Sequence, residues 1–466
     1  MQQSKLIVHL KALSRPELNR LRDFVHSPYY NKHPKVTALM DLLCELHPDF
    51  EAEPLDKKKV FKKLFPKQKF EEQKLSHLMN YLLKLLEQFL ATEAFEADDF
   101  LRKYLAVQEL KTKVPGKIYE RKLQQMLKNL DKKDQLSADY FLYKGKAEAE
   151  LDEFYINRKK RTKANFLQKK SDSLDHFFLA TKLQYYCDML NRSNVLNIEY
   201  DYPLLDALLQ LIASNQEKYL GNPLIGIYYR ILMTLYEPDA EQHFSALKNN
   251  LLQFSSEFPQ QEAKAMYDYA QNYCIKRINQ GDSKYLRELL DLYQLMLEKE
   301  LIFEKGLFPP SDFKNIVTIA CRLSEFEWTE SFIHRYKNKL DEKIREDVFQ
   351  YNLAAFYYEK NDFEKALQLL HTVQFTDTYF ALGARSMLMK IYFEMEEDDA
   401  LDAHFHAFKI YLLRNKVISA YQRKVHLNFI RFTKRIYSLK NKKPYTAKKT
   451  FDQSLKKLRQ QIDKSK

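Results

Sequence analysis

The sequence contains very little glycine and proline. Its 466 residues include only 7 glycines and 14 prolines. All-β and α/β folds need frequent tight turns, and many of these turns need glycine because its backbone tolerates a positive φ. Leu, Lys, Glu, Gln and Ala, which lose little side-chain freedom in a helix, are abundant. The composition therefore predicts an all-α protein whose helices are joined by short turns.

Cysteine is also scarce. The four cysteines, Cys44, Cys187, Cys274 and Cys321, lie far apart and match no disulfide framework or metal-binding spacing. No cysteine has neighbours that suggest an activated thiolate. We therefore expect four buried, reduced thiols, as in a cytoplasmic protein.

The sequence lacks a long uncharged apolar run. The most apolar stretch, Leu220–Tyr236, contains Arg230 in its middle and Pro223 near its start. A membrane-spanning helix needs about 20 apolar residues, so this stretch is predicted to be a buried helix. Near the N-terminus His9 and Lys11 interrupt the apolar residues, which argues against a signal peptide. These features predict a soluble, cytoplasmic protein without a membrane partner.

The usual signatures of catalysis are missing. No two glycines are closer than five residues apart, so the glycine-rich loops that hold phosphates are excluded. There is no H-E-x-x-H or G-x-S-x-G motif. His404 and His406 point in different directions on a helix, and the acidic run Glu394–Asp399 lacks the spacing of a calcium loop. We predict no cofactor, no metal site, no catalytic residue and no enzymatic activity.

Positive charge is concentrated in two places. The net charge is +13, and Leu439–Lys466 contributes 10 Lys/Arg against 2 Asp. A second cluster comprises Arg158, Lys159, Lys160, Arg161, Lys163, Lys169 and Lys170. A solvated helix end explains this cluster most simply. Phosphate contacts in a nucleic-acid-associated or regulatory protein remain the alternative for both regions.

Helix signals divide the chain into four regions. In residues 1–95, Ser14 and Glu17 have capping-box spacing, and further helices are expected over Pro34–His47, Asp56–Pro66 and Glu71–Thr92. These helices predict an N-terminal bundle. Residues 96–258 are expected to form long helices, residues 259–438 helical repeats, and residues 439–466 a basic tail.

The repeat prediction rests on Tyr351–Leu370. Leu353 and Ala354 are followed by Tyr357, a short turn, and then Phe363 and Ala366 on a second helix. This segment resembles a tetratricopeptide repeat, in which small residues let two helices approach while aromatics fill the space around them. Ala400 follows Ala366 by 34 residues, the period of that family. The resemblance implies an α-solenoid with a concave groove. The stretches SPYYNKH and LATKLQYYCDMLNR also resemble bacterial helical proteins, a likeness that implies no activity.

The resemblance also predicts which residues contact a partner. Tyr351 and Tyr358 share one helix stripe, and a shift of 34 residues places Arg385, Met389 and Tyr392 on the next helix. Aromatic residues and arginine are enriched in binding hot spots. The function predicted is a non-enzymatic scaffold or adaptor that binds a peptide or helix of a partner protein. The alternative for these tyrosines is packing against the adjacent repeat, and the sequence does not identify the partner.

Overall fold

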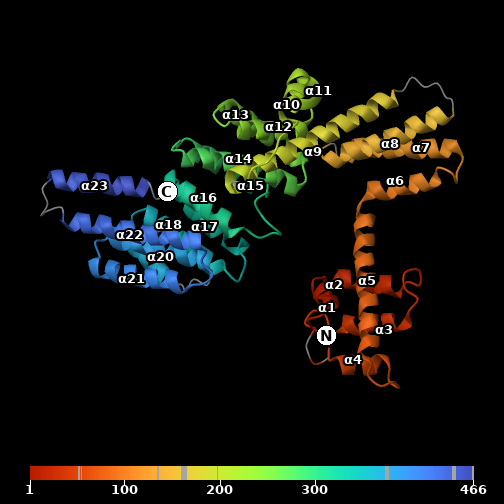
Figure 1. Ribbon diagram of the computed structural model, residues 1–466, viewed down its shortest axis with the longest axis horizontal. Helices are drawn as coiled ribbons and strands as arrows, with labels where there is room; N and C mark the ends of the chain where they lie inside the picture. Colours follow the sequence, from red (N-terminus) through yellow and green to blue (C-terminus); the bar gives the residue numbers. More distant parts are fainter. Residues whose placement is uncertain are drawn as a thin grey trace. The chain divides into compact units, whose positions relative to one another are not determined.

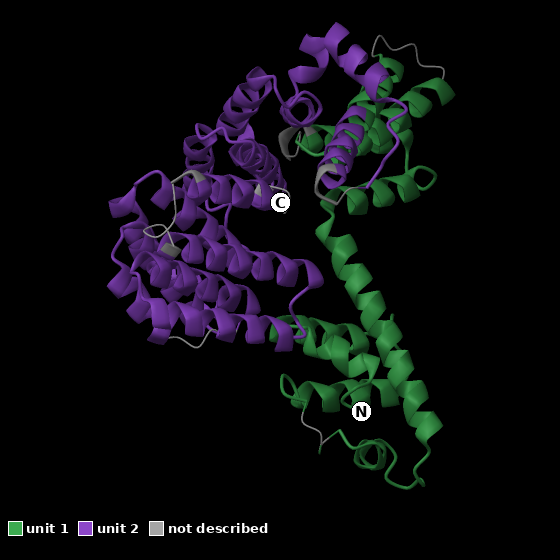
Figure 2. Cartoon of the chain, turned by 60° about the vertical axis from the view of Figure 1, so that its left-hand side comes forward, with its two compact units in different colours: residues 1–178 green, residues 179–466 purple. Residues whose placement is uncertain are grey.

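A computed structural model describes residues 1–50, 53, 55–133, 136–158, 165–196, 198–372, 377–442 and 448–463. The chain is 79% helical, and the described residues contain no strand, so the all-α prediction is confirmed. No helix in this part of the chain is long and apolar enough to cross a membrane. The contacts divide the chain into two compact units, Met1–Phe178 and Leu179–Lys466 (Figure 2). The finer division predicted from the sequence stays a prediction.

The first unit begins with a helical bundle around one long helix (Figure 1). Its members are α1 (Lys5–Lys11), α2 (Arg15–His26), α3 (Pro34–Glu45), α4 (Lys57–Leu64) and α5 (Glu72–Ala97). Buried leucines of α5 pack with Val25 of α2, Leu39 of α3 and Phe61 of α4 in one apolar core. Because burying such side chains stabilises a fold by about 1.5–3 kcal/mol each, this core holds the bundle together.

Local signals set the helix starts of the bundle. The Ser14 backbone N–H donates to the Glu17 carboxylate at 2.7 Å, as the capping-box spacing predicts. Asp56 precedes α4 and accepts from two backbone N–H groups of its first turn. The sequence prediction missed α1, where Ser4 caps a seven-residue helix. That helix is short, and its first turn follows the chain start by only four residues, so the pattern is weak.

The rest of the first unit has separate, smaller cores. Its helices are α6 (Asp99–Leu110), α7 (Gly116–Lys133), α8 (Ala138–Asn157) and the first part of α9 (Phe166–Leu196). Leu123 of α7 and Leu151 of α8 belong to one cluster, and Tyr140 and Phe141 belong to another. Polar contacts reinforce the packing, since Ser173 of α9 donates to the buried Glu148 carboxylate at 2.9 Å.

The second unit continues from α9 through a long series of helices. They are α10 (Leu205–Ser214), α11 (Gln216–Leu220), α12 (Pro223–Tyr236), α13 (Glu241–Phe254), α14 (Gln260–Asn279), α15 (Tyr285–Glu298), α16 (Pro310–Arg322), α17 (Phe326–Tyr336), α18 (Arg345–Glu359), α19 (Phe363–Thr372), α20 (Thr378–Glu394), α21 (Asp398–Arg414), α22 (Ala420–Lys442) and α23 (Lys448–Asp463). Leu220–Tyr236, the stretch predicted to be a buried helix, includes the largely buried α12.

One turn geometry recurs between helices of this unit. Gly281, Ser324, Asn361 and Glu396 each have a positive φ directly after a long helix. The next residue donates its N–H to a carbonyl five positions back, for example Glu325 to Ala320 at 3.0 Å. These hydrogen bonds end a helix in the Schellman manner and start the next one at once. The turns join α14 to α15, α16 to α17, α18 to α19, and α20 to α21.

Neighbouring helix pairs contact each other in a regular order. Within each pair the two helices pack together, and the first helix of one pair often contacts the first helix of the next, as α16 does with α18 and α18 with α20. The second helix of each pair also contacts the first helix of the following pair, as in α15 with α16 and α17 with α18. The pairs therefore form a continuous series in which each packs on its neighbours.

The basic C-terminal region is helical where it is described. Helix α23 packs on α22, with Leu458 buried and Leu455 41% exposed. Arg435 of α22 also bonds to Gln461 of α23. Residues 448–463 of the predicted basic tail therefore form a helix that packs on α22. Residues 443–447 and 464–466 of the predicted tail lie outside the described residues.

Candidate binding face of the second unit

Three helices of the second unit present residues from equivalent positions. Lys314 of α16, Tyr351 of α18 and Ser386 of α20 each lie ten residues before the left-handed turn residue that follows their helix. Together with Tyr379 at the start of α20, these residues form what we term the first-helix face. The Tyr351 ring lies so close to Gly383 that a Cβ there would meet its hydroxyl at 2.8 Å. Gly383 thus permits α20 to approach Tyr351.

Lys314 is the centre of this face. Its ammonium donates to the Tyr379 hydroxyl at 2.8 Å and lies 4.2 Å from that ring and 5.4 Å from the Tyr351 ring. Burial opposes the charge of Lys314, whereas both tyrosine hydroxyls favour it, and the net effect is a raised pKa. Lys314 therefore remains a cation at neutral pH, held by aromatic rings.

No described carboxylate forms an ion pair with Lys314. His426 of α22 lies on the same side, because its ring nitrogen bonds to Ser386 at 3.2 Å. Burial lowers the pKa of His426, and the charge of Lys314 lowers it further. The face is consequently a half-buried positive site, and among the described residues its charge is balanced by tyrosine rings and hydroxyls. An anionic group of a ligand would find a complementary charge there.

Acidic residues gather at the neighbouring end of the series. Lys264 of α14 pairs with Asp268 at 3.4 Å and with Glu304 at 3.5 Å. Burial raises the pKa of Asp312 on α16 to about 6; Lys264 opposes that rise, and Asp268 and Glu304 add to it. Burial also raises the pKa of Asp268, against the pull of Lys264. This end carries excess negative charge and would attract a cationic group.

The two tyrosines predicted to bind a partner have different environments. Tyr351 is buried, and its ring meets Phe380 edge-on with centroids 5.3 Å apart. It contributes to the first-helix face as the support of Lys314. Tyr358 is half-buried, lies 5.7 Å from the Phe363 ring, and has the Lys390 ammonium 5.9 Å above it. Tyr358 therefore packs at the turn between α18 and α19.

The three residues predicted on α20 pack against neighbouring helices. The Arg385 guanidinium stacks 4.2 Å from the Tyr411 ring of α21. Met389 is fully buried in the core that α20 shares with α21 and α22. Tyr392 accepts or donates a hydrogen bond with His371 of α19 at 3.1 Å. The structure places Met389 in the interior, and Arg385 and Tyr392 in the packing between helices.

A one-residue difference in register explains this placement. The period of 34 residues equates Tyr351 with Arg385, but the turn residue moves by 35, from Asn361 to Glu396. One residue rotates a side chain by about 100° around a helix. Ser386, and not Arg385, is therefore the counterpart of Tyr351. Met389 corresponds to Ala354, and both are fully buried.

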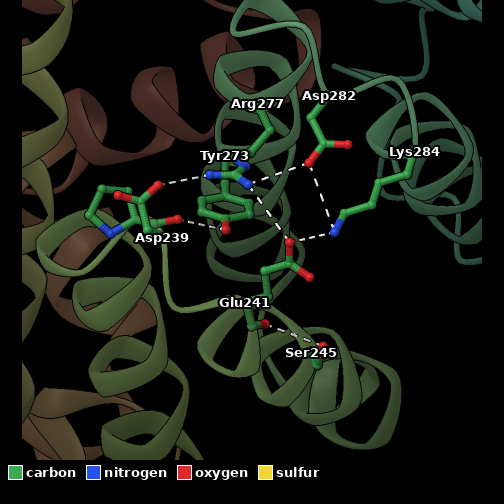
Figure 3. Close-up of polar contacts among 8 residues, drawn as sticks. Asp239, Glu241, Ser245, Tyr273, Arg277, Asp282 and Lys284 are labelled. Carbon is green, nitrogen blue, oxygen red and sulfur yellow. Dashed lines mark hydrogen bonds and ion pairs between the residues drawn. The ribbon is translucent and has the colours of Figure 1, made fainter.

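A second polar cluster ties two helix pairs together (Figure 3). Arg277 of α14 contacts Asp239 at 3.0 Å, Asp282 at 3.4 Å and Glu241 at 3.7 Å. Lys284 pairs with Glu241 and, at 3.8 Å, with Asp282. Each of these carboxylates already has a cation partner within the protein. The cluster therefore has a structural role, which is to link the α12–α13 connection to the α14–α15 turn.

An aromatic cavity lies on the second helices of the series. It has a volume of about 710 Å³ and is lined from α15 and α17, with Phe303 between them. Trp328, the single tryptophan of the chain, stacks on Phe332 with centroids 5.3 Å apart. Glu298 and Arg335 are among its charged lining residues. The cavity can accept an apolar side chain, but it is separate from the first-helix face.

Other residues singled out from the sequence have structural roles. The thiols of Cys187, Cys274 and Cys321 are buried, and burial raises the pKa of each, so none is an activated nucleophile. His404 and His406 each bond to a backbone carbonyl. Among the residues that the structure describes, no group of three or more His, Cys, Asp or Glu side chains could hold a metal ion.

The basic cluster at the end of α8 is only partly described. Arg158 lies 4.7 Å from the Phe154 ring, Lys169 lies 5.7 Å from the Phe166 ring, and Lys170 pairs with Asp152 at 2.8 Å. These three residues have partners within the protein. The other four members, Lys159, Lys160, Arg161 and Lys163, lie outside the described residues.

Sequence reasoning missed Lys314 and Tyr379, the two central residues of the first-helix face. They lie 65 residues apart and meet through their hydrogen bond. Lys314 and Tyr351 each lie ten residues before a left-handed turn residue, so the turns could have identified Lys314. The turn residue after Lys314 is Ser324, and a serine does not mark a left-handed turn in a sequence as a glycine does. No family model, curated protein or solved structure matches this chain.

Proposed function

We propose that the protein is a non-enzymatic scaffold whose second unit is a tetratricopeptide-like α-solenoid, and that its first-helix face binds a segment of a partner protein. The repeated left-handed turns and the order of contacts between first helices support the solenoid assignment. The residues from Tyr351 to Leu370 that resemble the repeat form the pair α18 and α19.

The observation that carries the proposal is the Lys314 ammonium, which is half-buried without a carboxylate partner among the described residues. Burying a charge raises the free energy of the folded protein unless the charge is paired. The tyrosine rings and hydroxyls compensate the Lys314 charge, as its raised pKa shows, but no described carboxylate neutralises it. A lysine at this position is useful if a ligand supplies the anion.

The charges of the face also define the ligand. An anionic group would lie at Lys314, and a cationic group at Asp268 and Asp312. An extended peptide or the polar face of a helix can present both charges along its length. Tyr379, which is 46% exposed, supplies the apolar and hydrogen-bonding surface next to the anion site.

The test compares Lys314→Gln with Lys343→Gln in affinity capture from native cells. Lys343 is exposed and forms no ion pair in the described residues, so the two variants lose the same charge. We expect Lys314→Gln to reduce partner recovery by roughly tenfold, since a hydrogen bond to a charged group contributes about 1.5–3 kcal/mol. Lys343→Gln should recover the partner fully.

Both variants should melt within a few degrees of the unchanged protein. Equal recovery by the two variants, or loss of recovery only together with unfolding, would remove the first-helix face as the binding site. If the captured protein turned over a substrate, the non-enzymatic assignment would be contradicted.

A further inference from the structure

The segment between α2 and α3 runs along the outside of α5 in the N-terminal bundle. Near one end, Tyr30 stacks on Phe24 with centroids 3.9 Å apart, and Phe24 meets Phe89 of α5 at 5.7 Å. Further on, His33 lies 6.1 Å from Tyr81 of α5. The segment therefore follows two turns of α5, and it places its side chains beside those of the helix.

Lysines continue this surface toward the start of α5. The Lys35 ammonium donates to the Leu64 carbonyl at 2.7 Å and lies 5.3 Å from the Phe65 ring. The Lys74 ammonium lies 4.7 Å from the same ring. Phe65 thus holds two ammonium groups from different helices near each other. Lys67 follows in the exposed loop before α5.

The outer stripe of α5 carries the same chemistry. Lys74, His77, Tyr81 and Lys84 are spaced by three or four residues, so they share one face of the helix. Tyr81 is 41% exposed, and the exposed carboxylates of Glu71 and Glu87 lie beyond the two ends of this set. The stripe combines cations with an exposed aromatic ring.

Several lysines of this surface have no ion-pair partner within the described residues: Lys32, Lys35, Lys67, Lys69, Lys74 and Lys84. Elsewhere in the bundle Lys57 pairs with Glu72 and Lys59 with Glu53, whereas Lys5, Lys11, Lys58, Lys62 and Lys63 also form no ion pair among the described residues. We name the six lysines, with Tyr29 and Tyr81, the basic–aromatic face. The positive charge of this face can attract an anionic ligand from outside the bundle.

A buried asparagine holds the loop that carries the most exposed aromatic residue of this face. Asn31 is only 5% exposed, and its amide donates to the Val25 carbonyl at 2.9 Å and to the Thr37 hydroxyl at 3.1 Å. Its side-chain oxygen accepts from the His33 backbone N–H at 2.8 Å. Tyr29, two residues earlier, is 85% exposed. A rigid loop that presents a tyrosine loses little entropy on binding.

We propose that the basic–aromatic face binds single-stranded nucleic acid, with the lysines at phosphates and with Tyr29 and Tyr81 stacked on bases. Lysines alone would suit any polyanion, but exposed rings between them favour a ligand that has flat, unpaired bases. This function goes beyond the proposed scaffold role and belongs to a different unit of the chain.

The test measures binding of fluorescein-labelled oligo(dT) and oligo(U) to the full chain by fluorescence anisotropy at several salt concentrations. Lys67→Glu/Lys69→Glu should weaken binding and reduce the slope of log affinity against log salt by about 1.4, since each phosphate contact to a single strand contributes about 0.7. Tyr29→Ala should weaken binding about tenfold, within the range found for one stacked base, and should leave the salt slope unchanged.

Matched controls lie in the second unit. Lys456→Glu/Lys457→Glu makes the same charge change at exposed positions of α23, and Tyr421→Ala removes a ring that is 75% exposed. Both controls should retain affinity, and all four variants should melt as the unchanged protein does. An equal loss in the controls would show a general charge effect and overturn the proposal. Absence of salt-dependent oligonucleotide binding, or binding only to phosphatidylserine vesicles, would also overturn it.

Discussion

The N-terminal bundle and the first-helix face use their interiors differently. The bundle buries leucine, valine and phenylalanine, and among its described residues Asn31 is the buried polar side chain. The first-helix face and its acidic end instead hold Lys314, Asp268 and Asp312 partly out of water. The bundle thus buries apolar side chains, as most stable cores do, whereas the face keeps charged side chains partly buried.

Burial disfavours the ionised forms of Asp268 and Asp312, whereas the tyrosines compensate the charge of Lys314. A buried apolar side chain stabilises a fold, whereas a buried charge without full compensation destabilises it. Displaced pKa values and unpaired charges concentrate at functional sites for this reason. We therefore read the bundle core as structural and the first-helix face as a binding surface, and the following experiments test that contrast.

The largest effect is expected in the bundle core. Leu82 of α5 is fully buried, so Leu82→Ala leaves a cavity and should lower the free energy of unfolding by about 2–5 kcal/mol. Chemical denaturation followed by far-ultraviolet circular dichroism measures this change. Leu90→Ala on the same helix is the control, because Leu90 is 43% exposed and should cost less than about 1 kcal/mol. Equal losses would contradict the packing of α5.

A smaller, pH-dependent effect is expected at Asp312. Burial raises its folded pKa to about 6 from an ordinary value of 3.8, so the folded state holds this proton more tightly. The resulting stability is present below about pH 4 and is lost as the pH rises through 6. The whole pKa shift corresponds to a change of up to about 3 kcal/mol in the free energy of unfolding. Because Asp312 is partly exposed, solvent screening reduces the expected change to about 1–2 kcal/mol.

Asp312→Asn isolates this contribution, since asparagine resembles the protonated acid. The variant should match the unchanged protein at pH 4 and exceed its free energy of unfolding by about 1–2 kcal/mol at pH 7.5. Denaturation curves at the two pH values measure the difference. A stability difference that does not change with pH would mean that Asp312 titrates normally and that the acidic end is not strained.

The smallest effect is expected at the repeated turns. A left-handed conformation destabilises the folded state by about 1–2 kcal/mol when the residue has a Cβ. Glycine removes this strain, but it also increases the conformational entropy of the unfolded chain, which offsets part of the gain. Ser324→Gly, at φ 60°, should therefore raise the free energy of unfolding by about 0.5–1 kcal/mol. Asn361→Gly should gain less, because asparagine tolerates this conformation. Destabilisation by Ser324→Gly would argue against a shared turn geometry.

Most of the helical fold was predictable from local sequence. Helix starts are marked by well-understood backbone chemistry at Ser14 with Glu17, at Asp56, and at the prolines that begin α3 and α12. The turns were harder, because Gly281 is a glycine and its counterparts at Ser324 and Glu396 are not. Tertiary packing holds those residues in a conformation that their own preferences do not predict.

The candidate site was predictable only in part. Tyr351 was identified, but a period of 34 instead of 35 residues moved the prediction on α20 from Ser386 to Arg385. A shift of one residue turns a helix by about 100°, which is enough to exchange the first-helix face for the core. Lys314 and Tyr379 come together because α16 and α20 both pack on α18. Such a contact between distant helices has no periodic signal in the sequence.

The most direct test places a photo-crosslinking amino acid, p-benzoylphenylalanine, at position 379 of the full chain in native cells. Tyr379 is aromatic and 46% exposed beside Lys314, so the substitution is tolerated and lies within reach of a ligand. We predict an adduct with one partner protein at position 379, none at the exposed position of Lys343, and loss of the adduct when Lys314→Gln is added. Absence of an adduct at position 379, or equal adducts at both positions, would contradict the assignment of the first-helix face as a binding surface.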